Sequence, residues 1–216
     1  MNYTSGSGTS TLTFNYTVGA GETSADLDYA STAALALNGG TIGDAAGNPA
    51  TLTLPAPGAA NSLGANKAIV IDTTSPVVSI ARINGAVPTF PYWTNSNVTS
   101  IGGDCGQLSG DLATVAVAIN GSPASPATAT CSSGAWTLTL STPVSAEASH
   151  SVVATQTDTA GNTGTSAART VIIDRTAPTV TITCIPNGKS GSGTCSGAAA
   201  NGTGDSPNVT LTITLN

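Results

Sequence analysis

Two pentapeptides place an aspartate and an asparagine around a glycine turn, DAAGN at 44–48 and DTAGN at 158–162. Two further aspartates, Asp72 and Asp174, each follow a short β-branched run. Hard cations such as Ca²⁺ take about six to eight oxygen ligands from carboxylates, amides and backbone carbonyls. If each pentapeptide faces one of these aspartates, the sequence predicts shared Ca²⁺ ligands among Asp44, Asn48, Asp72, Asp158, Asn162 and Asp174.

The same pentapeptides also fold without a metal. Asp and Asn side chains accept hydrogen bonds from their own backbone in Asx turns, and D-x-A-G-N forms a good hairpin in this way. The alternating Asp or Asn residues and final Glu of an EF-hand loop are absent from the sequence. Both interpretations are therefore open. Asp26 and Asp28, which share one face of ADLDYA by the two-residue period of a strand, are a further candidate pair.

Four cysteines supply the other reactive groups, and none has the C-x-x-C spacing of zinc ribbons or redox motifs. Cys184 and Cys195 bracket a Gly/Ser-rich stretch, whereas Cys105 and Cys131 lie in the middle of the chain. We expect two local disulfides, 105–131 and 184–195, formed in an oxidising compartment. The alternative is four reduced, buried thiols.

Catalytic chemistry has little to build on. His150 is the only histidine, so any Ser-His-Asp triad would need it, but the chain has no G-x-S-x-G elbow. It also lacks a Gly-rich phosphate loop that precedes a helix. We expect a structural His150 and a protein that is not an enzyme.

Aromatic residues offer a possible ligand surface. Phe90, Tyr92 and Trp93 lie in the run FPYW, where exposed rings could stack on a sugar or anchor a protein partner. Alternatively, Trp93 packs under a loop. Trp136, in GAWTLTL, is expected to be a core residue.

An internal repeat organises the chain that must position these residues. IVIDTTSPVVSI at 69–80 recurs as VIIDRTAPTVTI at 171–182, which places Asp72 and Asp174 102 positions apart. This is the length of an immunoglobulin-like sandwich. Only 7% of the residues are charged, and Thr, Ser, Gly, Ala and Val fill most positions, a composition that favours an all-β fold. The repeat divides the chain into 1–74, 75–176 and 177–216.

The two outer segments are predicted to be incomplete. Before the first junction we expect about five strands, and after the second about two, whereas a sandwich needs about seven. The expected strands of the first segment are 11–18, 25–30, 33–39, 50–55 and 67–72. Those of the last segment are 179–184 and 209–216, with turn-rich sequence between them.

Two explanations fit this count. Either both ends are half domains cut from a longer array, or the last strand of one molecule completes the sheet of the next. That last strand is an unpaired edge, and its alternating apolar residues are Val209, Leu211, Ile213 and Leu215.

The middle segment resembles the bacterial Ig-like repeats of large secreted cell-surface proteins and adhesins. The resemblance rests on the run from Ser132 to Gly164, with its Trp strand, Ser-His strand and D-x-A-G-N hairpin, followed by IDRTAP. The first segment looks like the second half of another repeat of this kind. The resemblance implies tandem Ig-like β-sandwiches with incomplete half domains at both ends.

These observations predict a structural segment of a bacterial extracellular fibre or adhesin. Its expected partners are copies of itself or adjacent Ig-like modules, and the alternative is a module that binds surface glycans or proteins. The net charge of −6 leaves no basic stripe for nucleic acid. No apolar run approaches the roughly 20 residues that membrane insertion by a helix needs. Apart from Ca²⁺, no cofactor is expected.

Overall fold

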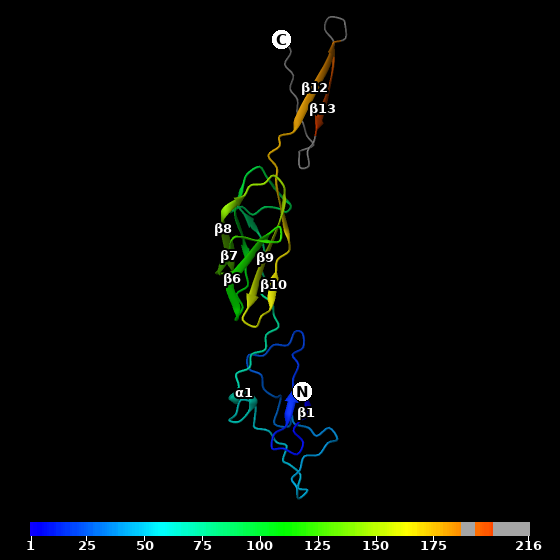
Figure 1. The fold of residues 1–216 in the computed structure, drawn as a ribbon, viewed down its shortest axis with the longest axis vertical. Helices are drawn as coiled ribbons and strands as arrows, with labels where there is room; N and C mark the ends of the chain where they lie inside the picture. The colour runs from blue at the N-terminus through cyan, green and yellow to red at the C-terminus, as the bar shows by residue number, and fades with distance from the viewer. Residues whose placement is uncertain (187–192, 201–216) are drawn as a thin grey trace. The chain divides into compact units, whose positions relative to one another are not determined.

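The computed structural model describes residues 1–186 and 193–200, and the chain divides into two units (Figure 1). One unit comprises Met1–Ser75 together with Asp158–Asn162. The other comprises Pro76–Thr157 and the chain from Thr163 onward.

The second unit contains the main sheet structure. Its strands join in the order β3-β5-β8-β7-β6-β9-β11-β4, with β10 paired to β9 and β4 parallel to β11. The strands are β3 (Arg82–Ile83), β4 (Tyr92–Thr94), β5 (Val98–Asp104), β6 (Asp111–Ile119), β7 (Ser122–Ser132), β8 (Ala135–Val144), β9 (Ser149–Asp158), β10 (Thr163–Thr165) and β11 (Arg169–Ile173).

Strand β7 connects the two layers of a sandwich. Its first part pairs with β6, and its last two residues, Cys131 and Ser132, pair with β8. The turns on both sides of β7 suit the twist of paired strands. Asn120-Gly121 and Ser133-Gly134 have two successive positive φ angles, as type I′ hairpin turns require.

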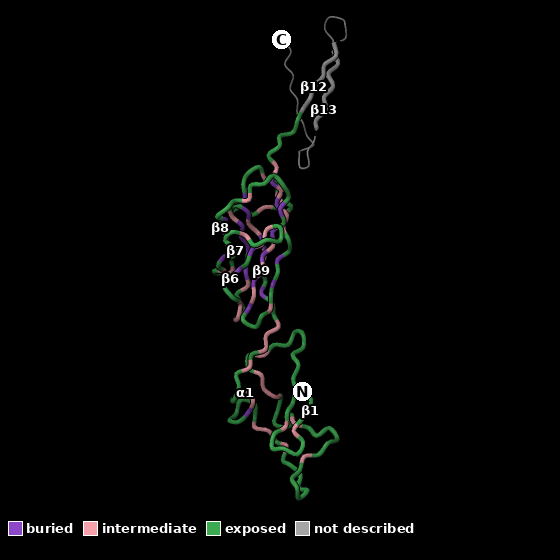
Figure 2. Tube along the Cα trace, viewed as in Figure 1, coloured by how far each residue is buried: buried purple, intermediate pink, exposed green. Residues whose placement is uncertain are grey.

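The core lies between the two layers, and the strands show why. Buried residues recur at every second position along β9 and the first part of β8, so that one face of each strand points into the core (Figure 2). Trp136 on β8 is 2% exposed, and its indole N–H donates to the carbonyls of Ser79 and Asp104, each at 3.1 Å. Trp136 is therefore the core tryptophan that the sequence predicts.

The first unit differs from the prediction of about five strands. It contains β1 (Asn2–Ser5), β2 (Thr13–Asn15) and the short helix α1 (Leu63–Asn66). Of residues 1–75, only Ser62 is buried. The other predicted strands form isolated pairs, such as Ser24 with Ile71. Pairs of strands without a buried apolar face are marginal, which explains why the predicted ladders do not extend.

The last described segment is a hairpin of β12 (Thr179–Pro186) and β13 (Gly193–Ala200). β12 confirms the strand predicted at 179–184, whereas β13 was predicted as turn-rich sequence. The predicted strand 209–216 lies outside the described residues. No helix in the described part of the chain is long and apolar enough to cross a membrane.

Candidate functional site

The pentapeptide DAAGN forms a closed hairpin in the first unit. The Asp44 N–H donates to the carbonyl of Asn48 at 3.0 Å, and one carboxylate oxygen of Asp44 accepts from the N–H groups of Ala46 and Asn48, each at 2.9 Å. The Asn48 side-chain amide donates to the other oxygen at 2.8 Å. Gly47 has a φ of 87°, which a glycine adopts without strain. Asp44 and Asn48 are both exposed.

The pentapeptide DTAGN repeats this arrangement. The Asp158 carboxylate accepts from the backbone N–H and from the side-chain amide of Asn162, each at 2.8 Å. The Asn162 amide has a second hydrogen, which it donates to the backbone carbonyl of Asp72 at 3.0 Å. Asp158 is only 4% exposed. The hairpin therefore holds a junction residue of its own unit.

These hydrogen bonds lower the pKa of both aspartates. Donation by the Asn48 side-chain amide lowers the pKa of Asp44, and donation by the Asn162 side-chain amide lowers the pKa of Asp158. Partial desolvation opposes the shift at both residues without reversing it. Both carboxylates are thus kept charged, and their oxygens are occupied by amide donors.

The structure unites only part of the predicted Ca²⁺ set. Asp44 lies with Asn48, and Asp158 lies with Asn162 and the carbonyl of Asp72. The Asp72 carboxylate accepts from the Thr74 N–H at 2.9 Å instead of facing the hairpin. In residues 1–186 and 193–200, no three Asp, Glu, His or Cys side chains gather as a metal site would require. Calcium binding stays a prediction.

Asp26 and Asp28 point toward the same place. A Cβ atom added at Gly64 on α1 would lie 2.9 Å from one carboxylate oxygen of Asp28 and 3.2 Å from one of Asp26. The Gly58 N–H donates to Asp28 at 3.0 Å. The two carboxylates therefore lie on one side, as the period of two predicts, and Asp28 holds the backbone next to α1.

The second junction makes its own set of contacts in the second unit. The Asp174 N–H donates to the carbonyl of Thr94 at 3.0 Å, and the Asp174 carboxylate accepts from the Thr176 N–H at 2.9 Å. Glu147 accepts from the Arg175 N–H at 2.8 Å and from the Thr176 hydroxyl at 2.7 Å. The Thr176 hydroxyl is the largest cause of the lowered pKa of Glu147.

Arg175 adds two further bonds. Its guanidinium donates to the carbonyl of Ser145 at 2.7 Å and to the side chain of Asn97. Sequence reasoning did not identify Glu147 or Arg175, because their partners are separated by about thirty positions in the sequence. An available hint was the acidic residue just before the Ser-His strand.

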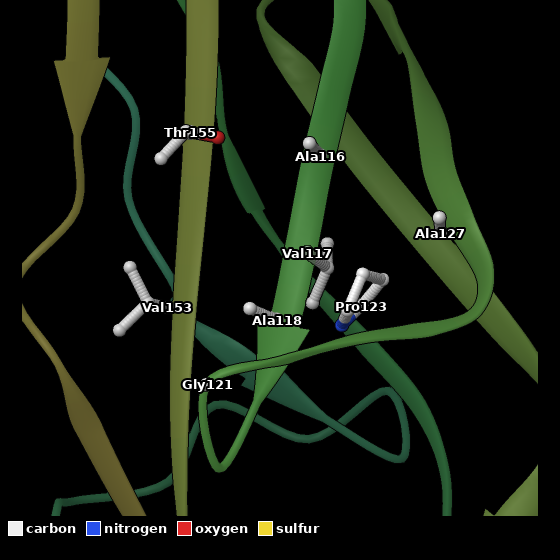
Figure 3. A pocket seen from close by; sticks show the side chains of 8 residues that line it. All are labelled: Ala116, Val117, Ala118, Gly121, Pro123, Ala127, Val153 and Thr155. Carbon is white, nitrogen blue, oxygen red and sulfur yellow. The ribbon is translucent and has the colours of Figure 1, made fainter.

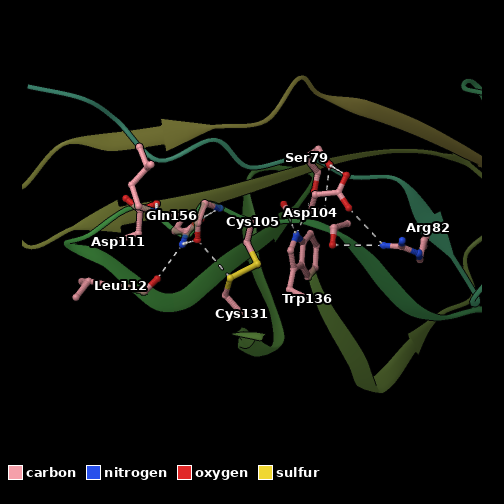
Figure 4. Close-up of a disulfide and its surroundings, with 12 residues drawn as sticks. Ser79, Arg82, Asp104, Cys105, Asp111, Leu112, Cys131, Trp136 and Gln156 are labelled. Atoms are coloured by element: carbon pink, nitrogen blue, oxygen red, sulfur yellow. Dashed lines mark hydrogen bonds and ion pairs between the residues drawn. A yellow bond between two sulfur atoms is a disulfide. The ribbon is translucent and has the colours of Figure 1, made fainter. Parts of the chain in front are cut away.

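The disulfide between Cys105 and Cys131 confirms one of the two predicted bridges (Figure 4). Beside it, the buried Gln156 side chain accepts from the Gly106 N–H at 2.8 Å and donates to the Gly106 carbonyl at 3.1 Å. It also donates to the carbonyl of Leu112 at 2.9 Å. Gln156 thereby fixes the loop that follows Cys105. Sequence reasoning missed this residue.

For the other bridge, the strand register places Cys184 directly opposite Cys195. Their side chains lie outside the described atoms, so this disulfide stays a prediction.

His150 is buried and has structural partners. One ring nitrogen lies 2.9 Å from the carbonyl of Ala146, and the other lies 3.2 Å from the side-chain amide of Asn120. A ring nitrogen next to a carbonyl must carry the proton, so the opposite nitrogen accepts from Asn120. This arrangement fixes the ring between two elements of the sandwich.

The predicted aromatic surface is only partly exposed. Phe90 and Tyr92 pack against the core, and the Arg169 guanidinium lies 5.0 Å from the centre of the Phe90 ring. Trp93 is 38% exposed. Residues alternate in direction along β4, so Tyr92 faces inward and Trp93 outward. Trp93 is the ring of this group that a ligand could reach.

A small apolar cavity of about 240 Å³ opens beside β6 and β9 (Figure 3). Its lining carries one hydroxyl, that of Thr155, and no ionisable side chain. The cavity can therefore make apolar contacts but offers no acid, base or nucleophile. Its lining residues are Ala116, Val117, Ala118, Gly121, Pro123, Ala127, Val153 and Thr155.

Comparison with known families agrees with the sandwich just described. Residues 93–175 match the family model described as a bacterial Ig-like domain, a span that runs from β4 to the residue after Asp174. This confirms the resemblance predicted for the middle segment. No curated protein matches the chain.

Proposed function

We propose, on the premise that residues 93–175 form a bacterial Ig-like domain, that the chain is a structural segment of a bacterial extracellular fibre or adhesin. Domains of this family are structural or binding modules and are typically not enzymes. The Cys105–Cys131 disulfide supports an oxidising, extracellular location. In this role, the sandwich is a stiff spacer.

One observation carries the assembly part of the proposal, namely the unequal burial of the two units. The sandwich has a continuous apolar core, whereas residues 1–75 bury only Ser62. The first unit nevertheless contains paired backbone segments, such as Leu27 with Ile69, that resemble part of a sheet. A segment with strand pairs and no core gains stability when further strands cover it.

Copies of the same chain would supply these strands. The sequence predicts a strand at 209–216, in which Val209, Leu211, Ile213 and Leu215 would share one face by the period of two. Added to the first unit of another molecule, that strand would provide backbone hydrogen bonds and an apolar face. A head-to-tail contact of this kind forms a filament when it does not close into a ring.

The contacts at the second junction favour the proposal that the sandwich is a stiff spacer. Glu147 and Arg175 bind across it, and Pro178 follows with its φ angle fixed by the ring. A junction held in this way resists bending where the sandwich ends.

Electron microscopy with light scattering of the purified chain tests the proposal. Wild type should form filaments, and Ile213→Pro should form none because proline removes the N–H that strand addition needs. Thr203→Pro, in the turn-rich run, is the matched control and should still form filaments. Monodisperse wild-type protein at high concentration would contradict assembly by strand complementation.

A second candidate function rests on Trp93. Its 38% exposure on the outer face of β4 suits stacking on a sugar ring or anchoring a protein. Trp93→Ala should abolish binding on a glycan array, while a cooperative unfolding transition shows that the sandwich remains folded. Val87→Ala removes another exposed apolar side chain and should leave any binding intact. Equal binding by wild type and Trp93→Ala would reject this function.

A further inference from the structure

The two D-x-A-G-N hairpins have the same internal bonds but different surroundings. In both, the Asn side-chain amide donates to the Asp carboxylate at 2.8 Å. In both, the glycine has a positive φ, 87° at Gly47 and 93° at Gly161. Yet Asp158 is 4% exposed and Asn162 is half-buried, whereas Asp44 and Asn48 are exposed; the three residues between them are exposed in both hairpins. The difference therefore lies in what covers each hairpin.

The second hairpin contacts the backbone of the first junction. Asn162 uses one amide hydrogen for Asp158 and the other for the carbonyl of Asp72, at 3.0 Å. Asn48 uses one amide hydrogen for Asp44. Its other hydrogen meets no acceptor among residues 1–186 and 193–200. The exposed hairpin thus presents the donor that the covered hairpin uses to hold a junction.

The repeat identifies a matching acceptor in the same chain. Asp174 follows the same isoleucine-ending run as Asp72, 102 positions later. Both aspartates accept from the N–H two residues ahead, Thr74 and Thr176, each at 2.9 Å. The two junctions therefore share the same Asx turn. The carbonyl of Asp174 receives no donor from the described residues.

We infer that the hairpin Asp44–Asn48 is a docking site for the second junction of another copy of this chain, in which the Asn48 side-chain amide donates to the Asp174 carbonyl. This inference rests on the proposed head-to-tail assembly and assigns one of its contacts. A single hydrogen bond adds about two- to tenfold in affinity, so its main effect is to fix register and orientation.

A difference in one residue limits how closely the docked second junction can repeat the contact between Asn162 and the first junction. A Cβ atom added at Gly164 would lie 1.8 Å from the carbonyl oxygen of Pro76, so that glycine allows the first junction to lie against β10. The corresponding residue of the first unit, two positions after Asn48, is Ala50. The docked junction must therefore turn away after Asp174, and the contact is confined to the hairpin itself.

Sedimentation velocity over a dilution series tests this contact with the full chain. Asn48→Ala removes the outward donor and should raise the dissociation constant of self-association about fivefold. Ala45→Ser changes the same exposed hairpin without removing any of its hydrogen bonds and should associate like wild type. In chain labelled with ¹⁵N-asparagine, the Asn48 side-chain amide signal should shift as association proceeds.

The outcomes separate this inference from the proposed function. Association that is equally strong in wild type and Asn48→Ala, with an unshifted Asn48 signal, would overturn the docking contact and leave strand complementation standing. A chain that does not associate at any concentration would overturn both. A shifted signal with weaker association of Asn48→Ala, but not of Ala45→Ser, would support the contact.

Discussion

The Asn162 side-chain amide has two hydrogens, and the structure uses both of them. One stabilises the negative charge of Asp158 within a hairpin, and the other holds the backbone of Asp72. At this scale the polar groups that suggest metal chemistry are satisfied by amide donors. Gln156 acts similarly beside the disulfide, where it bonds both backbone groups of Gly106. These side chains organise loops.

Acid should weaken the hairpin at Asp158. The Asn162 amide lowers the pKa of Asp158 below its ordinary value of 3.8. The carboxylate therefore contributes stability that is fully present above pH 3.8 and is lost as pH falls through the lower folded pKa. An NMR titration of the side-chain carboxyl carbon checks this. Asn162→Ala should raise the pKa of Asp158, and a wild-type Asp158 that titrates above 3.8 would contradict the account.

Replacement of Gln156 should be costly. Gln156→Leu leaves the N–H and carbonyl of Gly106 and the carbonyl of Leu112 without their partner, and we expect a loss of about 3 kcal/mol in unfolding free energy. Chemical denaturation measures it. Gln107→Leu alters an exposed glutamine of the same loop and should cost less than about 0.5 kcal/mol. Equal stability of the two variants would show that the Gln156 bonds contribute little.

At the scale of elements, the sandwich depends on β7, which pairs with β6 in one layer and with β8 in the other. The disulfide lies at this crossing, because Cys131 is opposite Trp136 on β8. It thereby ties the loop after β5 to the strand that joins the layers. The hairpin β12–β13 is a sheet of its own, separate from this arrangement.

Removal of the central disulfide should lower stability substantially. The bridge links two cysteines that are 26 positions apart in the sequence. By the chain-entropy estimate, the double variant Cys105→Ala/Cys131→Ala should therefore lose about 3 kcal/mol of unfolding free energy. Thermal unfolding followed by tryptophan fluorescence reports on Trp136 in the core. The control double variant Cys184→Ala/Cys195→Ala changes residues outside the sandwich sheet and should leave that unfolding transition unchanged. Unchanged stability of the first double variant would reject a stabilising role for the bridge.

The elements also show what the sequence could predict. Trp136, the 105–131 pair and the strand at 179–184 follow from local pattern and spacing, and the structure contains all three. The Gln156 contacts span about fifty positions, and no local pattern predicts them. Of the five strands expected before residue 75, only 11–18 contains a strand of the ladder, β2, and the shortfall has another reason. Alternation predicts which face a strand would bury, but it does not supply the neighbour that completes the sheet.

For the molecule as a whole, the two units differ in how much apolar surface they bury. The sandwich has its own apolar core, whereas the first unit has a few backbone pairs and buries little. Local openings in such a unit should be frequent, because few buried contacts oppose them. Assembly would change this balance by covering the first unit with strands of another copy. If this assembly occurs as proposed, the stability of residues 1–75 depends on protein concentration.

Hydrogen exchange of the first unit in dilute and in assembled protein tests this central claim most directly. The N–H groups of Ser24, Leu27 and Ile71, which bond across the predicted sheet, should exchange rapidly in dilute chain and slowly in assembled chain. The sandwich strands β8 and β9 serve as an internal reference and should be protected in both. Protection of the first unit in dilute monomer, or rapid exchange in the assembled chain, would contradict completion by another copy.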